Sequence, residues 1–145
     1  MPPRIKILPT DEMLRTLQRA GHYVTNDFRT FQESCSCRIT PSGVTVDFIK
    51  LYRLYTVDNL IVELSKTKHR LSAPNEGLAL AIHKLNGNIG DISEPIMIID
   101  GSFFMDGVQQ CLCLQMWNAT TRITKSALSH ALRPGNFILT TAIDN

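Results

Sequence analysis

Two Cys-x-Cys units carry the clearest chemical potential in this sequence. They are Cys35-Ser36-Cys37 and Cys111-Leu112-Cys113, and both lie in stretches that favour β-strand. Because alternate side chains of a strand share a face, each unit predicts two neighbouring thiols. Zinc sites usually place two to four residues between paired cysteines, so this spacing fits a metal poorly. We predict reduced, mostly buried thiols that hold neither a metal nor another cofactor; redox or modification chemistry is the alternative.

Histidines that could activate a thiol or a serine are few. The sequence contains His22, His69, His83 and His130, and none of them lies in a recognisable nucleophile motif. We therefore assign no catalytic residue. A small cysteine-dependent or metal-dependent enzyme remains the alternative to a binding protein.

Basic residues gather in the first half of the chain. Residues 1–70 contain 11 Lys and Arg against 7 Asp and Glu, a balance of +4, whereas residues 71–145 contain 4 against 6, a balance of −2. With Tyr52 and Tyr55 between them, these charges predict a surface that binds nucleic acid or an acidic partner, and an ordinary solvated loop is the other reading. The candidate binding residues are Lys50, Arg53, Lys66, Lys68, His69 and Arg70.

Length and composition indicate a globular protein. The 145 residues are 43% hydrophobic, which suits a single α+β domain over residues 1–145 with one core. The sequence shows neither an export signal nor a transmembrane segment, which predicts a cytoplasmic or nuclear protein.

The periodicity of apolar residues predicts the elements. It indicates helices at residues 10–21, after 72–75 and at 121–132, with a short helical turn near 25–31. It indicates strands at 35–40, 44–53, 56–65, 95–99, 102–105, 108–117 and 137–143. Hairpin turns are expected at 41–43, at Asp100-Gly101 and at Asp106-Gly107. The predicted fold is α+β, a single domain with a mainly antiparallel sheet of about six to seven strands and three helices.

Self-association is the function that this pattern favours. Strands at 108–117 and 137–143 offer more surface than a modest sheet hides, and an uncovered strand edge pairs readily with another chain. We expect a small intracellular binding or assembly module that forms a homodimer or larger closed assembly, a class that includes viral structural and accessory proteins. Thr140 is expected to point outward from the last strand.

Overall fold

A computed structural model describes residues 2–35, 43–117 and 119–143 of the chain. Over these residues the chain forms eight strands and five helices, so the prediction of a mixed fold with a mostly antiparallel sheet is confirmed, while both counts exceed the prediction. The elements are β1 (Arg4–Lys6), α1 (Thr10–Arg19), β2 (Tyr23–Val24), α2 (Phe28–Glu33), β3 (Gly43–Lys50), α3 (Val57–Lys66), β4 (His69–Leu71), α4 (Pro74–Leu85), β5 (Ile92–Met105), β6 (Val108–Trp117), β7 (Thr120–Ala127), α5 (Leu128–Ala131) and β8 (Phe137–Ala142).

A single sheet joins the two halves of the chain. Its strand order is β1-β3-β8-β5-β6-β7-β2, and β4 pairs with β8 beside this path. The pairings of β5 with β8 and of β2 with β7 are parallel, and the others are antiparallel. Strand β8 is therefore interior, and Thr140 is fully buried. The expectation that Thr140 points outward is wrong, because packed cores cover both faces of the sheet, so the side chains of this interior strand are buried on either side.

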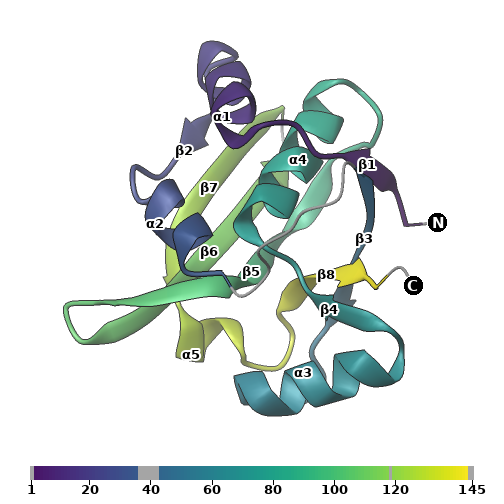
Figure 1. The fold of residues 1–145 in the computed structure, drawn as a ribbon, viewed down its shortest axis with the longest axis vertical. Coiled ribbons are helices and arrows are strands. Elements are labelled where there is room, and N and C mark those ends of the chain that lie inside the picture. Colours follow the sequence, from purple (N-terminus) through teal and green to yellow (C-terminus); the bar gives the residue numbers. More distant parts are fainter. Residues whose placement is uncertain (1, 36–42, 118, 144–145) are drawn as a thin grey trace.

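Helices cover both faces of the sheet (Figure 1). Helices α1, α2 and α4 pack on one face and form the first core, whereas α3 and α5 belong to a second core on the opposite face. Strand β5 supplies both cores by alternation, with Ile96 and Ile98 in the first and Met97 and Ile99 in the second. Within the described residues, no helix is long and apolar enough to cross a lipid bilayer.

The strand predicted at residues 56–65 is a helix, α3. The Thr56 hydroxyl caps its first turn by accepting a hydrogen bond from the Asn59 N–H at 3.1 Å. Leu60 and Leu64, four residues apart, are buried, while Ile61 is exposed, a burial pattern of helical period. The segment resembled a strand because Leu60, Val62 and Leu64 alternate with other residues, although Val62 is exposed in the helix.

The helix predicted at residues 121–132 is mostly strand β7. Thr121 and Ile123 are buried while Arg122 between them is exposed, which is the two-residue period of a strand. Strand β7 pairs with β6 along its whole length, and only Leu128–Ala131 forms a helix, α5. Tertiary pairing overrides the weak helical pattern of this segment.

One of the two predicted Asp-Gly turns is a hairpin turn. Asp106 and Gly107 both have positive φ, 51° and 80°, and join β5 to β6, as predicted. Asp100 and Gly101 instead lie inside β5, where the register with β6 shifts between Ile98 and Phe103.

The strand predicted at 44–53 ends at Lys50. The strand predicted at 35–40 and its turn lie almost wholly outside the described residues.

Candidate interaction surface

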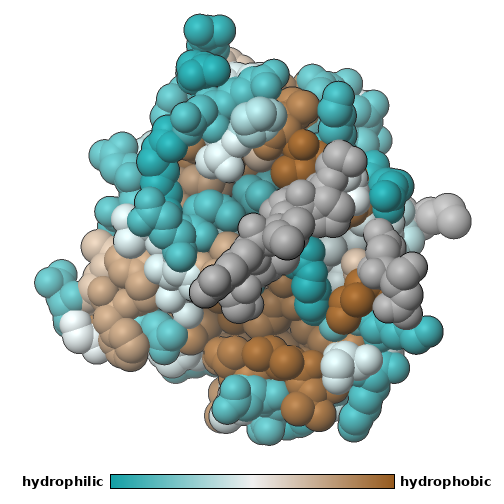
Figure 2. Space-filling view, viewed as in Figure 1, coloured by the Kyte–Doolittle hydropathy of each residue, from teal (hydrophilic) through white to brown (hydrophobic). Residues whose placement is uncertain are grey.

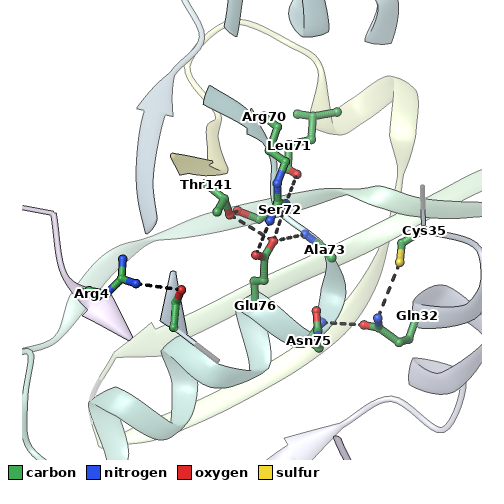
Figure 3. Close-up of polar contacts among 11 residues, drawn as sticks. Arg4, Gln32, Cys35, Arg70, Leu71, Ser72, Ala73, Asn75, Glu76 and Thr141 are labelled. Carbon is green, nitrogen blue, oxygen red and sulfur yellow. Dashed lines mark hydrogen bonds and ion pairs between the residues drawn. The ribbon is translucent and has the colours of Figure 1, made fainter. Parts of the chain in front are cut away.

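Arg70 turns away from the predicted basic surface. Its guanidinium donates to both carboxylate oxygens of Glu76, from Nη1 to Oε1 at 2.8 Å and from Nη2 to Oε2 at 2.7 Å (Figure 3). Glu76 is fully buried and also accepts from the Ala73 N–H at 2.8 Å and from the Thr141 hydroxyl at 3.1 Å. Arg70 therefore joins β4 to the start of α4.

Lys68 lies in the turn that joins α3 to β4, and His69 is the first residue of β4. Lys68 has a φ of 58°, and its carbonyl accepts a hydrogen bond from the Ile143 N–H at 2.8 Å. The His69 Nδ1 lies 2.8 Å from the Thr67 carbonyl oxygen, a distance that places the ring nitrogen as a donor to it. This turn anchors the end of the chain beyond β8.

Arg53 and Lys66 meet at one shallow cleft of about 440 Å³. The cleft is lined by Tyr52, Arg53, Asn59, Val62, Glu63 and Lys66. Lys50 is not among the lining residues; its ammonium lies 5.9 Å from the centre of the Phe137 ring. The fold thus brings two of the six predicted binding residues together and distributes the other four over β3, β4 and the turn before β4.

Glu63 neutralises part of that cleft. Its carboxylate accepts a hydrogen bond from the Tyr52 hydroxyl at 2.9 Å and pairs with Arg53 at 3.5 Å. Hydrogen bonds from Tyr55 and Tyr52 lower the pKa of Glu63, with Arg53 adding to the effect. Burial raises the pKa of Tyr55, and its hydrogen bonds with Tyr52 and Glu63 raise it further. The Arg53 guanidinium lies 4.1 Å from the centre of the Tyr55 ring.

An apolar cleft of about 440 Å³ opens between α3, α5 and the β5–β6 hairpin. It lies on the face of the sheet that carries the second core, because Leu128 and Leu132 belong to both. Leu54 stands at its rim with 67% of its surface exposed. The lining residues are Leu54, Tyr55, Thr56, Val57, Val108, Gln109, Leu128, Ser129 and Leu132.

The β5–β6 hairpin carries an exposed aromatic ring beside this cleft. Phe103 faces the first core, where its ring contacts that of Phe31 with a centroid distance of 4.4 Å. Phe104, the next residue, points to the opposite face and is 68% exposed. It pairs in register with Gln109, which lines the cleft, so the Phe104 side chain and the cleft open on the same side. We call the exposed Phe104 side chain the hairpin knob.

A second apolar cleft, of about 530 Å³, lies on the other side of the first turn of α3. Val57 lines both clefts, and Ile61 lines the second. Figure 2 shows the resulting apolar surface along the lower and lower-left margin of the molecule, over α3 and the hairpin. Exposed large apolar residues that gather in this way mark interaction sites more often than isolated ones do.

Charges of opposite sign lie at the two ends of this surface. Asp106, at the turn of the hairpin, is exposed next to the knob. Arg133, which follows Leu132, is exposed and basic, whereas Arg53, which precedes Leu54, pairs with Glu63, and Asp58, which follows Val57, is exposed and acidic. Arg133 is therefore the group beside the cleft whose charge complements that of Asp106.

Sequence reasoning missed this surface although a signal for it was present. Neighbouring residues of a strand point to opposite faces, so Phe103-Phe104 next to a two-residue turn places one aromatic ring on each face of a projecting hairpin. A single chain covers one of these rings with α2 and leaves the other exposed.

Two of the cysteines that the structure describes lie deep within the protein. Cys111 and Cys113 are buried in the second core, which confirms the predicted burial of this pair, and burial raises the pKa of the Cys111 thiol from 9.0 to about 12. Cys35 is partly buried and its sulfur accepts a hydrogen bond from the Gln32 amide at 3.6 Å; Cys37 lies outside the described residues. In the part of the chain that the structure describes, no group of three or more His, Cys, Asp and Glu side chains is placed to hold a metal ion.

Comparison of the chain with known protein families, with curated proteins and with solved structures found no match.

Proposed function

We propose that this protein is a self-assembly module in which two copies bind each other through the hairpin knob and the apolar cleft. The observation that carries the proposal is the position of Phe104, a 68% exposed ring that faces the same side as the cleft lined by Gln109. Such an arrangement supplies a convex and a concave apolar feature on one surface.

Two-fold symmetry turns this arrangement into a closed dimer. In a two-fold interface the same surface of both copies meets itself, so each copy must offer both halves of every contact. The knob of one copy enters the cleft of the other, and the reverse contact follows by symmetry. Both apolar features are covered in the same step, which removes exposed Phe104 and Leu54 surface from water.

Charge supports the same pairing. When the knob of one copy enters the cleft of its partner, Asp106 approaches the side of the cleft next to Arg133. Like charges would oppose such a contact, whereas these are opposite. A heterologous arrangement that left knobs uncovered would extend into a filament, whereas the reciprocal contact predicts an assembly that stops at two copies.

The test is the mass in solution of wild-type and variant protein. We expect wild type to sediment at about twice 16.3 kDa at micromolar concentration, and Phe104→Ser to sediment at 16.3 kDa. Trp117→Ser is the matched control, because Trp117 is 54% exposed at the other end of β6 and should leave the dimer intact. Urea unfolding of Phe104→Ser should differ from that of Trp117→Ser only by the loss of association.

A charge change provides an independent test. Asp106→Arg places like charges at the knob and at the cleft rim, and should weaken dimerisation by about tenfold at low salt and less at high salt. A 16.3 kDa wild-type species throughout the micromolar range, or a Phe104→Ser variant that dimerises like wild type, would contradict the proposal.

A further inference from the structure

Strands β2, β6 and β7 place a row of polar and aromatic side chains on one face of the sheet. Gln115 on β6 pairs in register with Arg122 on β7, and Arg122 pairs with Tyr23 on β2. Trp117 pairs with Thr120 in the next row of the same face. Because residues that pair in register point to the same side, all five side chains share one face.

This row, which we call the aromatic platform, lies on the same face as the second core but beyond its helices. Cys111 and Cys113 precede Gln115 and Trp117 on that face of β6, and both cysteines are buried. Helices α3 and α5 lie toward one end of the sheet, whereas β7 continues away from them toward α1 (Figure 1). Trp117 is 54% exposed and Tyr23 is 50% exposed.

The platform has a hollow and a positive charge. A cleft of about 300 Å³ is lined by Gln115, Trp117, Thr120 and Arg122. The Arg122 guanidinium lies 5.6 Å from the centre of the Tyr23 ring, close enough for a cation–π contact. The position of Arg122, opposite Tyr23 and two residues along β7 from Thr120, places a cation between the two aromatic rings. None of the five platform residues is acidic.

We propose that the aromatic platform binds single-stranded nucleic acid. One unpaired base stacks on Trp117 and another stacks on Tyr23, while Arg122 contacts the phosphate between them. Exposed aromatic rings on an open sheet bind unpaired bases because every base has an aromatic face, and a neighbouring cation neutralises the backbone. Gln115 adds a hydrogen-bonding group for the base edges. Paired bases stack on each other and hide these faces, so a duplex is a poor ligand for the platform.

The platform is separate from the surface proposed for assembly. Val108 and Trp117 are the two ends of β6, which at about 3.3 Å per residue places them roughly 30 Å apart. A dimer formed through the hairpin knob therefore leaves both platforms available. Binding of nucleic acid and dimerisation can be tested one without the other.

Trp117 is the only tryptophan of the chain, so its fluorescence reports directly on the platform. We expect titration with a single-stranded dodecamer of deoxythymidine, or of uridine, to quench this fluorescence to saturation. The affinity should fall as salt is raised, because phosphate contacts release counterions. A self-complementary duplex of the same length should bind at least tenfold more weakly.

Variants locate the site by their effect on a fluorescently labelled dodecamer followed by anisotropy. Trp117→Ala and Tyr23→Ala should each weaken binding about tenfold, through the loss of one stacked base. Arg122→Gln should weaken binding and reduce the slope of log affinity against log salt by about one. Tyr52→Ala is the matched control, because Tyr52 is also an exposed tyrosine near an arginine, Arg53, and should bind like wild type.

Three outcomes would overturn the proposal. The first is tryptophan fluorescence that neither dodecamer quenches at protein and ligand concentrations up to the high micromolar range. The second is a loss of binding in Tyr52→Ala but not in Tyr23→Ala, which would move the nucleic-acid site to the cleft around Arg53. The third is quenching by a neutral oligosaccharide such as cellohexaose without quenching by either dodecamer, which would assign the aromatic rings to a sugar.

Discussion

The guanidinium of Arg70 and the carboxylate of Glu76 form two parallel hydrogen bonds, of 2.8 and 2.7 Å, at the start of α4. Glu76 has no exposed surface, whereas the Arg70 side chain is 27% exposed. The pair links β4 to α4, and the Thr141 hydroxyl connects it to β8 through Glu76. An arginine that the sequence assigns to a binding surface thus satisfies a buried carboxylate.

Removal of the Glu76 charge should destabilise the fold. We expect Glu76→Gln to lower the free energy of unfolding by about 3 kcal/mol, because it leaves the Arg70 cation without its partner in a largely buried position. Urea denaturation measures this, and Lys66→Gln, at an exposed lysine, should change the stability by no more than about 0.5 kcal/mol. Equal midpoints for the two variants would mean that solvent, not Glu76, satisfies Arg70.

The sequence predicted the location of most elements but not always their type. Helices α1 and α4 and strands β6 and β8 lie where the apolar periodicity placed them, since their patterns are long and end at recognisable residues such as Gly87, with a φ of 78°. The strand predicted at residues 56–65 was wrong because Leu60, Val62 and Leu64 alternate as in a strand. In the structure Leu60 and Leu64 are buried whereas Val62 is exposed. Pattern alone contains no information on which apolar residue remains exposed.

The candidate site was less predictable than the fold. Closeness in sequence suggested one basic surface from Lys50 to Arg70, but α3 brings Lys66 to the cleft that Arg53 lines, while Arg70 pairs with Glu76. Glu76 is six residues from Arg70, so proximity in sequence hinted at the pair. The Arg70–Glu76 pair is identified by the complete burial of Glu76, which results from the packing of α4 on the sheet.

The helix cap of α3 tests its reassignment from strand to helix. Thr56→Ala should lower the free energy of unfolding by about 1 kcal/mol, because the Asn59 N–H loses its acceptor. Thr56→Ser keeps the hydroxyl and should unfold at nearly the same urea concentration as wild type. If residues 56–65 formed a strand, removal of this exposed hydroxyl would have little effect, and the alanine and serine variants would unfold together.

Two features require glycine at position 101: its positive φ and the lack of space for a Cβ atom. Its φ is +89°, and a Cβ atom at this position would lie 2.3 Å from the Phe31 carbonyl oxygen and 2.9 Å from Pro74 Cγ. Gly107 has a similar φ, +80°, with nothing within 4 Å of its would-be Cβ. We therefore expect Gly107→Ala to lower the free energy of unfolding by about 1–2 kcal/mol, because alanine is strained in the left-handed conformation. Gly101→Ala should lower it by about 3 kcal/mol or more.

Thermal or urea unfolding of these two glycine variants gives the difference directly. Equal losses of stability in the two variants would show that α2 can move away from β5 without destabilising the fold. A larger loss at Gly101 would show that the bulge in β5 is the close contact that fixes α2 on the sheet.

Ionisation of Cys111 should make the protein less stable in alkali. Burial raises the pKa of this thiol from 9.0 to about 12, so the unfolded chain releases the proton at a lower pH than the folded protein does. The contribution of Cys111 to stability is therefore fully present below pH 9 and is lost as the pH rises from about 9 to about 12. Cys111→Ala should show a flatter fall in the free energy of unfolding over this range, because lysine and tyrosine ionise in both proteins and only the thiol differs.

Thiol labelling of the native protein provides the second measurement. At pH 8, iodoacetamide should modify Cys111 and Cys113 much more slowly than the partly exposed Cys35, as followed by mass spectrometry of the peptides. After unfolding in urea, all three should react at similar rates. Parallel stability curves for wild type and Cys111→Ala above pH 9, or rapid native labelling of Cys111, would contradict the position of this thiol in the second core.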